Sequence, residues 1–424
     1  MGARKILESR EEFPEKKDGP AALGRGSRWR RWLANLLLLG FSMAITLSIT
    51  EVLLHAYFPF EDTTLQLDPR YLHRFKPNSQ EIYWFSEANG GKRLIAKVNA
   101  EGRRGELVDM DRPRILVYGD SFIAAMFSPM KEWFTYQLEQ KLKDKLTPSP
   151  QVVNCGVQGY GPDQESLVME DEIDRLKPRL IIISIYTSND FGDLLRDKIY
   201  KLDQKMQLQD NRYTLDPFLV RKFYEAEHLP RSYFARMVQK GWQMIFHPEN
   251  EPDDPTGGAY MDAALRDSQS EYKDYVIDGN NSVKNLLHDH YDADVSLTPN
   301  SDSAQYKRTL MDRVIEKMKR VADAHSVPLM LVIVPAPFDI VDNYAVTVDT
   351  KKYPEYRRSE LSDIVEGIAQ KYDIPYVNLY KPFREHGAAS LYFVVDNDHW
   401  NAAGEQLAAD LVADYIKQHR FETH

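Results

Sequence analysis

The sequence lacks several features that would indicate common kinds of site. It contains one cysteine, Cys155, so it can form no intramolecular disulfide and no cysteine-based zinc site. It has no HExxH spacing for a metalloprotease and no glycine-rich phosphate loop. The formal net charge of -10 argues against a general nucleic-acid binder, which would usually present a basic face. For this chain of 424 residues we therefore predict no metal, no organic cofactor and no nucleic-acid partner.

Charge is also missing from one long segment near the start. Residues 1–31 are polar and mixed in charge, which is typical of a disordered tail, and arginines stand at positions 28, 30 and 31. Residues 32–58 are mainly apolar, and Leu33–Thr50 carries no charge. A cleaved signal peptide or a buried core helix could also contain an apolar run, but the length favours an uncleaved transmembrane anchor. The preceding arginines then place the N-terminus in the cytoplasm and the rest of the chain in the periplasm.

The remainder changes its pattern at about residue 113. Residues 59–112 form a small β-rich lead-in broken by glycines. In residues 113–424, short apolar runs alternate with helical periodicity, which predicts strands separated by helices. The expected strands lie at 115–118, 152–153, 180–186, 329–334 and 376–379. This alternation predicts a flavodoxin-like, three-layer α/β/α fold with an open parallel sheet.

The alternation is interrupted at about residues 195–302. This stretch is polar and aromatic, and includes a loop-like segment at 248–258. We interpret it as a mostly helical insertion, and we expect it to pack beside the site as a cap, since long insertions near strand ends often do so.

Two segments that follow the first two strands carry candidate residues. Ser121 comes directly after the first strand in the sequence Gly-Asp-Ser-Phe, where a tight turn can expose its hydroxyl at the edge of the sheet. An N-cap serine has the same local sequence. After the second strand, the stretch from Asn154 to Gly161 contains three glycines, whose backbone N–H groups could bind an oxyanion or simply form a turn.

Two further segments follow later strands. Asn189 stands just after the most apolar strand, where its amide can donate to a developing negative charge or form an Asx turn. Near the C-terminus, Asp396 and His399 are three residues apart, so the carboxylate can orient the imidazole. Asp398 is a rival partner for His399, and Asn401 is expected to cap the last helix.

These four ordered segments resemble the blocks of the SGNH (GDSL-type) hydrolase superfamily. The resemblance implies Ser121 as the nucleophile, with His399 and Asp396 completing a catalytic triad. It implies an oxyanion hole made by the Ser121 and Gly159 N–H groups and the Asn189 amide. Residues 99–105, NAEGRRG, are similar to a segment of membrane-anchored bacterial members. One position departs from the pattern, because Thr187 stands where the third block usually has glycine, which puts the local turn in question.

The resemblance implies a serine esterase that removes acyl groups, acetyl by analogy, from envelope or exported glycans. The alternatives are an O-acyltransferase that passes the acyl group to a glycan, and a non-catalytic anchored scaffold in which Ser121 and His399 lie too far apart. Cys155 is interpreted as a buried apolar residue rather than a nucleophile. The sequence indicates no particular protein partner.

Overall fold

The computed structural model describes residues 25–57, 64–143, 145–197, 199–211, 232–246, 293–342, 348, 350–393 and 399–419. The chain divides into two compact units. The first comprises residues 1–60 and 230–241, and the second comprises residues 61–229 and 242–424.

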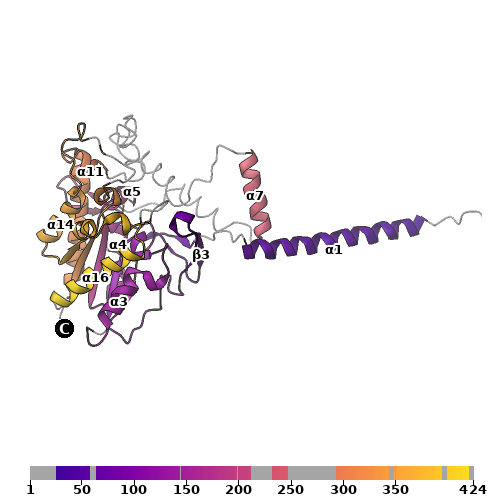
Figure 1. Ribbon diagram of the computed structural model, residues 1–424, viewed down its shortest axis with the longest axis horizontal. Helices are drawn as coiled ribbons and strands as arrows, with labels where there is room; N and C mark the ends of the chain where they lie inside the picture. Colours follow the sequence, from indigo (N-terminus) through magenta and orange to yellow (C-terminus); the bar gives the residue numbers. More distant parts are fainter. Residues whose placement is uncertain are drawn as a thin grey trace, which may run out of the picture. The chain divides into compact units, whose positions relative to one another are not determined.

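The second unit is built on a five-stranded parallel sheet with helices packed against it (Figure 1). The strand order is β11-β10-β7-β5-β6. Read from β6 and numbered along the chain, this order is 2-1-3-4-5, that of flavodoxin-like folds. The strands are β5 (Arg114–Tyr118), β6 (Gln151–Asn154), β7 (Leu180–Tyr186), β10 (Leu329–Val334) and β11 (Tyr376–Asn378). The predicted fold class is confirmed, and each strand agrees with its predicted range to within one or two residues. The apolar runs predicted the strands well because all of β5, β6, β7 and β10 is buried.

Helices cover both faces of this sheet. Its helices are α2 (Ser121–Ala124), α3 (Phe134–Lys143), α4 (Pro162–Leu176), α5 (Asp190–Asp197), α11 (Ala293–Leu297), α12 (Asp302–Ala324), α13 (Pro337–Ile340), α14 (Glu360–Lys371), α15 (Tyr380–Glu385) and α16 (Ala402–His419). Short 3-10 turns lie at Glu87–Asn89, Met130–Glu132 and Ala388–Ser390.

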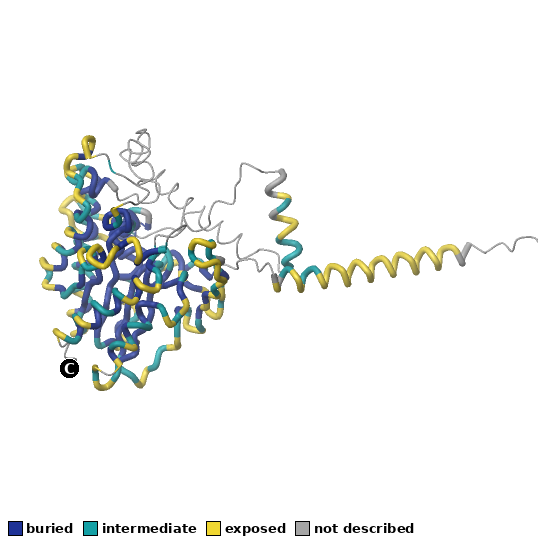
Figure 2. Tube along the Cα trace, in the orientation of Figure 1, coloured by how far each residue is buried: buried dark blue, intermediate teal, exposed yellow. Residues whose placement is uncertain are grey.

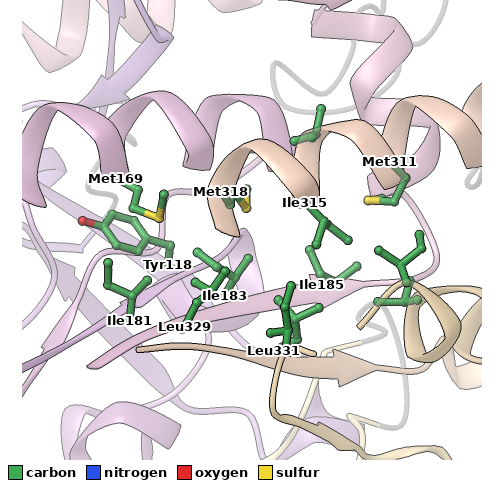
Figure 3. Close-up of a cluster of buried hydrophobic side chains, with 14 of the residues drawn as sticks. Tyr118, Met169, Ile181, Ile183, Ile185, Met311, Ile315, Met318, Leu329 and Leu331 are labelled. Atoms are coloured by element: carbon green, nitrogen blue, oxygen red, sulfur yellow. The ribbon is translucent and has the colours of Figure 1, made fainter. Parts of the chain in front are cut away.

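The sheet separates two hydrophobic cores, because successive side chains of a strand point to opposite faces. On one face, Ile181, Ile183 and Ile185 pack under α4, α5, α12 and α14, and Figure 3 shows side chains of α4 and α12 resting on the strands. On the other face, Leu180 and Ile182 pack with α3, α15 and α16. Figure 2 shows the buried strands between helices whose outer sides are exposed.

Before the sheet, residues 64–112 contain two antiparallel strand pairs. The first pair is β1 (Leu65–Asp68) with β2 (Leu72–Phe75), and the second is β3 (Gln80–Trp84) with β4 (Arg93–Lys97). Buried residues of these strands form a third cluster with Ala124 and Met126, which lie just after the first strand of the main sheet. The lead-in therefore packs directly on the segment that carries Ser121.

The described part of the insertion contains two short strands as well as helices. β8 (Tyr200–Leu202) pairs with β9 (Leu208–Asp210) in an antiparallel hairpin. The turn forms because Asp203 accepts hydrogen bonds from the backbone N–H groups of Lys205 (2.8 Å) and Gln207 (2.9 Å). The hairpin packs on α12, where the Tyr306 hydroxyl accepts from Leu202 N at 3.1 Å. The cap over Ser121 stays a prediction, because most of the insertion, including the segment at 248–258, lies outside the described residues.

The first unit contains α1 (Arg25–Tyr57) and the start of α7 (Tyr233–Phe246). The stretch Arg28–Leu54 of α1 is long and apolar enough to cross a membrane, with a mean hydropathy of 2.0 and no buried residues in that window. Glu51 of α1 accepts hydrogen bonds from the backbone N–H groups of Tyr233 (2.6 Å) and Phe234 (3.0 Å) and from the Ser232 hydroxyl (2.9 Å). The two helices are therefore joined at the N-terminus of α7.

In the second unit, the loops after β5 and β6 approach each other closely at Gly156. A Cβ atom added to Gly156 would lie 2.5 Å from the backbone nitrogen of Ala124 and 2.7 Å from the carbonyl carbon of Ile123. Real Cβ atoms do not come this near to backbone atoms. Glycine at 156 is therefore what lets the two loops touch.

We expect Gly156→Ala to lower the free energy of unfolding by about 1–3 kcal/mol, because backbone must shift to admit the methyl group. Chemical denaturation of the full chain in detergent measures this change. Gly367→Ala is the matched control: a Cβ there meets nothing within 4 Å, and alanine is favoured over glycine inside α14. Equal stability of the Gly156→Ala variant and the wild type would contradict the argument.

Candidate active site

Ser121 is the first residue of a short helix that directly follows β5. Asp120 caps this helix by accepting a hydrogen bond from Phe122 N at 2.9 Å. The helix stops after one turn because Ala125 adopts a left-handed conformation with φ of 48°. This tight turn leaves Ser121 partly exposed at the carboxyl end of the sheet, while the three residues that follow it are buried.

His399 lies before α16 and is held by aromatic side chains. Its ring stacks on Phe122 with centroids 4.7 Å apart and meets Phe127 edge-on at 4.8 Å. Its carbonyl accepts from Phe393 N at 3.0 Å. As expected, Asn401 caps α16, accepting from Ala403 N at 2.9 Å. Packing and backbone contacts thus fix the position of the imidazole.

The structure brings Ser121 and His399 into hydrogen-bond contact. His399 Nε2 lies 2.6 Å from Ser121 Oγ, the arrangement in which the imidazole can take the hydroxyl proton. The scaffold alternative required these residues to lie apart, and it is therefore wrong. The pair borders a cavity with about 180 Å³ of empty volume, part of it open to solvent. The other lining residues are Phe122, Ala125, Phe127, Ser128, Trp400 and Glu405.

The loop that carries Gly159 is tied to the nucleophile turn. Asn154 donates to Ile123 O at 2.5 Å and accepts from Gly156 N at 3.0 Å, and Val157 N donates to Gly119 O at 3.0 Å. Gly159 has a φ of 75°, so this position favours glycine. Gly159 does not line the cavity described above.

Asn189 lies in the turn between β7 and α5. Its side-chain oxygen is buried, and no hydrogen bond of its side chain is found among the described residues. Thr187, the departure from the family pattern, keeps a negative φ, so no glycine is needed there. The Thr187 hydroxyl instead donates to Val334 O at 3.2 Å, and its backbone N–H donates to the same atom at 3.0 Å. The threonine therefore joins this turn to the end of β10.

Sequence reasoning missed the supporting residues of the lead-in. His73 Nε2 lies 2.9 Å from Gln158 O, and Tyr160 donates its hydroxyl proton to His73 O at 2.8 Å, so β2 supports the Gly159 loop. Arg104 lies over the Trp133 ring at 4.7 Å and donates to Ala125 O at 3.4 Å, next to the nucleophile helix. Burial lowers the pKa of Arg104 to about 10. The resemblance of NAEGRRG to a family segment drew attention to residues 99–105, but it did not predict that Arg104 contacts the turn after Ser121.

Asp396 and its rival Asp398 both lie outside the described residues, so the third member of the triad remains a prediction. Cys155 is buried in the core, and burial raises the pKa of its thiol to about 12. A thiol that stays protonated is a poor nucleophile, which confirms the interpretation of Cys155 as an apolar residue.

A family model described as "SGNH hydrolase-like domain, acetyltransferase AlgX" matches residues 290–424. The SGNH resemblance is confirmed. The matched segment contains His399 and Asn401, and Ser121, Gly159 and Asn189 lie before it. The match covers about a third of the chain, and its description is consistent with an enzyme of the hydrolase or acyltransferase kind.

No curated protein sequence matches the chain. Among solved structures, it is similar to the acetyl xylan esterase AlAXEase, with 11% identity over 72% of this chain and 99% of that one and a TM-score of 0.34. It is also similar to a lipase/acylhydrolase from Enterococcus faecalis, with 13% identity over 72% of this chain and 96% of that one and a TM-score of 0.34. A two-domain esterase active on acetylated mannans gives 11% identity, 74% and 50% coverage and a TM-score of 0.35.

Behind the SGNH blocks lies a group of buried carboxyl side chains. Asp120 precedes Ser121 and Asp190 follows Asn189. The other members come from α4 and α5, namely Asp163, Glu165 and Asp193. Burial, followed by the nearby carboxylates, raises the pKa values of Glu165 and Asp190 well above their usual range. Within the described residues, neither oxygen of Glu165 has a hydrogen-bond partner. The group therefore holds protons that its members would lose in water.

This raised pKa predicts the sign of a pH effect on stability. In the unfolded chain Glu165 loses its proton near pH 4.3, whereas the folded chain keeps it to higher pH, so stability falls as pH rises above that value. We expect Glu165→Gln to remove up to about 1.4 kcal/mol of this fall per pH unit. Denaturation midpoints between pH 5 and 8 measure the slope. Ser166→Ala is the control: Ser166 is buried beside Glu165 but does not titrate, so this variant should keep the wild-type slope. If Glu165→Gln showed the same dependence of stability on pH as the wild type, the raised pKa of Glu165 would be contradicted.

Proposed function

We propose that this chain is a membrane-anchored serine esterase that acts on acyl groups, acetyl in the first instance, of envelope or exported glycans. The observation that carries the proposal is the 2.6 Å hydrogen bond between Ser121 Oγ and His399 Nε2 at the carboxyl edge of a parallel sheet. The acetylated-carbohydrate substrate is proposed by analogy with the similar esterases. The location is proposed from the apolar helix α1 and the arginines near its start.

The proposed reaction has two steps. Ser121 Oγ attacks the ester carbonyl carbon while its proton passes to His399 Nε2, and the Ser121 and Gly159 N–H groups and the Asn189 amide hold the oxyanion. His399 then gives the proton to the departing alcohol, which leaves an acyl-Ser121. Water attacks that ester, again losing its proton to His399, and His399 passes the proton to Ser121 Oγ as the acyl–oxygen bond breaks and the acid leaves. Asp396 is assigned the role of orienting His399.

A second candidate is an O-acetyltransferase, which the description of the matching family model favours. The first half of its reaction is the same, but a sugar hydroxyl rather than water attacks the acyl-Ser121. Incubation of the full chain with an acetyl ester and an unacetylated glycan separates the two. Free acetate in proportion to ester consumed supports the esterase, and acetylated glycan with little free acetate supports the transferase.

The roles of Ser121 and His399 predict non-additive losses. Ser121→Ala and His399→Ala should each abolish most turnover, and the double variant should be little worse than either, because the two residues act as a unit. Asn189→Ala should cost on the order of a hundredfold or more, since one oxyanion donor contributes a few kcal/mol. Rates with a panel of acetylated sugars measure these losses, with the exposed His386→Ala as the control. Full activity of Ser121→Ala would end the proposal.

The two aspartates near His399 give the sharpest test of the triad. Asp396→Asn should leave the fold intact but cost rate on the order of a thousandfold or more, because the imidazole would adopt the wrong tautomer. Asp398→Asn should change the rate little. The comparison needs only the same turnover assay, with unfolding midpoints to show that both variants fold. An inactive Asp398→Asn beside an active Asp396→Asn would reverse the assignment.

A further inference from the structure

We propose that α7 lies on the surface of the phospholipid bilayer that α1 spans, with its apolar face in the lipid interface. The inference rests on the anchor assigned to α1 but not on the reaction assigned to Ser121. α7 belongs to the insertion and begins 112 residues after Ser121. It has no role in the reaction proposed for Ser121 and His399.

The first observation is the position of Glu51. The uncharged stretch Leu33–Thr50 is about 27 Å long at 1.5 Å per residue, close to the roughly 30 Å of a bilayer core. Glu51 follows it immediately, so its carboxylate lies where the bilayer core ends. A carboxylate at that depth requires hydrogen-bond donors.

The second observation is where Glu51 finds those donors. Its oxygens accept from the first two backbone N–H groups of α7, Tyr233 N and Phe234 N, and from the Ser232 hydroxyl. Ser232 in turn accepts from Ala235 N at 3.2 Å. These are the N–H groups that a helix cannot satisfy by itself, and a negative charge there is favoured by the helix dipole. The N-terminus of α7 is therefore held at the level of the membrane edge.

The third observation is the apolar face of α7. Phe234, Met237, Val238, Gly241 and Trp242 follow the spacing i, i+3, i+4, i+7 and i+8, which places them on one side of a helix. Met237, Val238 and Trp242 are 42%, 51% and 60% exposed, so this side has little protein cover. Another aromatic residue of the insertion, Tyr200, is buried, but Trp242 is not.

The remaining geometry fits a bilayer rather than another occupant. Arg236 lies nearly opposite Val238, and Gln239 is turned about 100° away from it, so polar residues occupy the side away from the apolar face, as in helices that lie in the lipid interface. In Figure 1, α7 leaves the end of α1 across the axis of α1 rather than along it. If α1 crosses the membrane, a helix in that direction runs along its surface. Tryptophan is also the residue most typical of that depth.

Site-specific fluorescent labels test this placement in the full chain, reconstituted in vesicles of phosphatidylethanolamine and phosphatidylglycerol. Single cysteines are introduced as Leu38→Cys, Val238→Cys and Gln239→Cys and labelled with an environment-sensitive dye. The native Cys155 is buried, and the wild type gives the background labelling. Quenching is then measured with lipids that carry a spin label either high or deep in the acyl chain.

We expect the label at 238 to be quenched by the shallow spin label, the label at 239 to be quenched much less, and the label at 38 to be quenched by the deep one. Quenching at 38 without quenching at 238 would overturn the surface helix and leave the anchor in place. Equal quenching at 238 and 239 would also overturn it. No quenching at 38 would remove the anchor and this inference together, while ester turnover by the same preparation would report separately on the proposed reaction.

The contact of Glu51 has its own variant. Glu51→Ala in the Val238→Cys and Gln239→Cys backgrounds should reduce the difference in quenching between the two positions, because the N-terminus of α7 loses three hydrogen bonds. Glu51→Gln keeps an acceptor and should retain part of the difference. An unchanged difference in Glu51→Ala would show that Glu51 does not set the depth of α7 and would overturn that part of the proposal.

Discussion

The hydrogen bond between Ser121 and His399 joins residues that are 278 positions apart, and several other contacts keep its two ends in place. One end depends on a one-turn helix after β5, stopped by the left-handed Ala125. The other depends on a ring held between Phe122 and Phe127. Phe122 belongs to both ends, since it follows Ser121 in sequence and stacks on the ring of His399. A shift of the helix that begins at Ser121 would therefore move His399 with it.

At the same edge of the sheet, buried carboxyl groups contribute unfavourably to the stability of the folded chain. Asp120 and Asp190 adjoin Ser121 and Asn189 in sequence, and both are buried with Glu165 among other carboxyl groups. Buried carboxyls that keep their protons need no cation, but they lose stability to the unfolded chain as pH rises. Such a cost close to a reaction centre is common, because active sites often hold groups in environments that folding alone would not favour.

The sequence predicted the main sheet and the pairing of Ser121 with His399 for physical reasons that are local. The strands are short apolar runs, and the carboxyl ends of parallel strands must meet at one edge. The sequence could not show whether threonine at 187 fits a turn where the family usually has glycine. The fit depends on a hydrogen bond to Val334, which is 147 positions away. The support from His73 and Arg104 was also not predictable, since it depends on how the lead-in packs. The hairpin at Tyr200–Asp210 was missed because its turn relies on one side chain, Asp203.

The packing of the lead-in changes where the catalytic unit begins. The change of pattern at residue 113 suggested a boundary there, yet His73 and Arg104 contact the loops that carry Gly159 and Ser121. A fragment starting at residue 113 would expose the Met126 and Tyr160 surfaces that β1, β2 and β4 now cover. For expression, domain exchange or comparison with compact relatives, the smallest meaningful piece of this enzyme thus starts before Leu65, close to the end of the apolar helix.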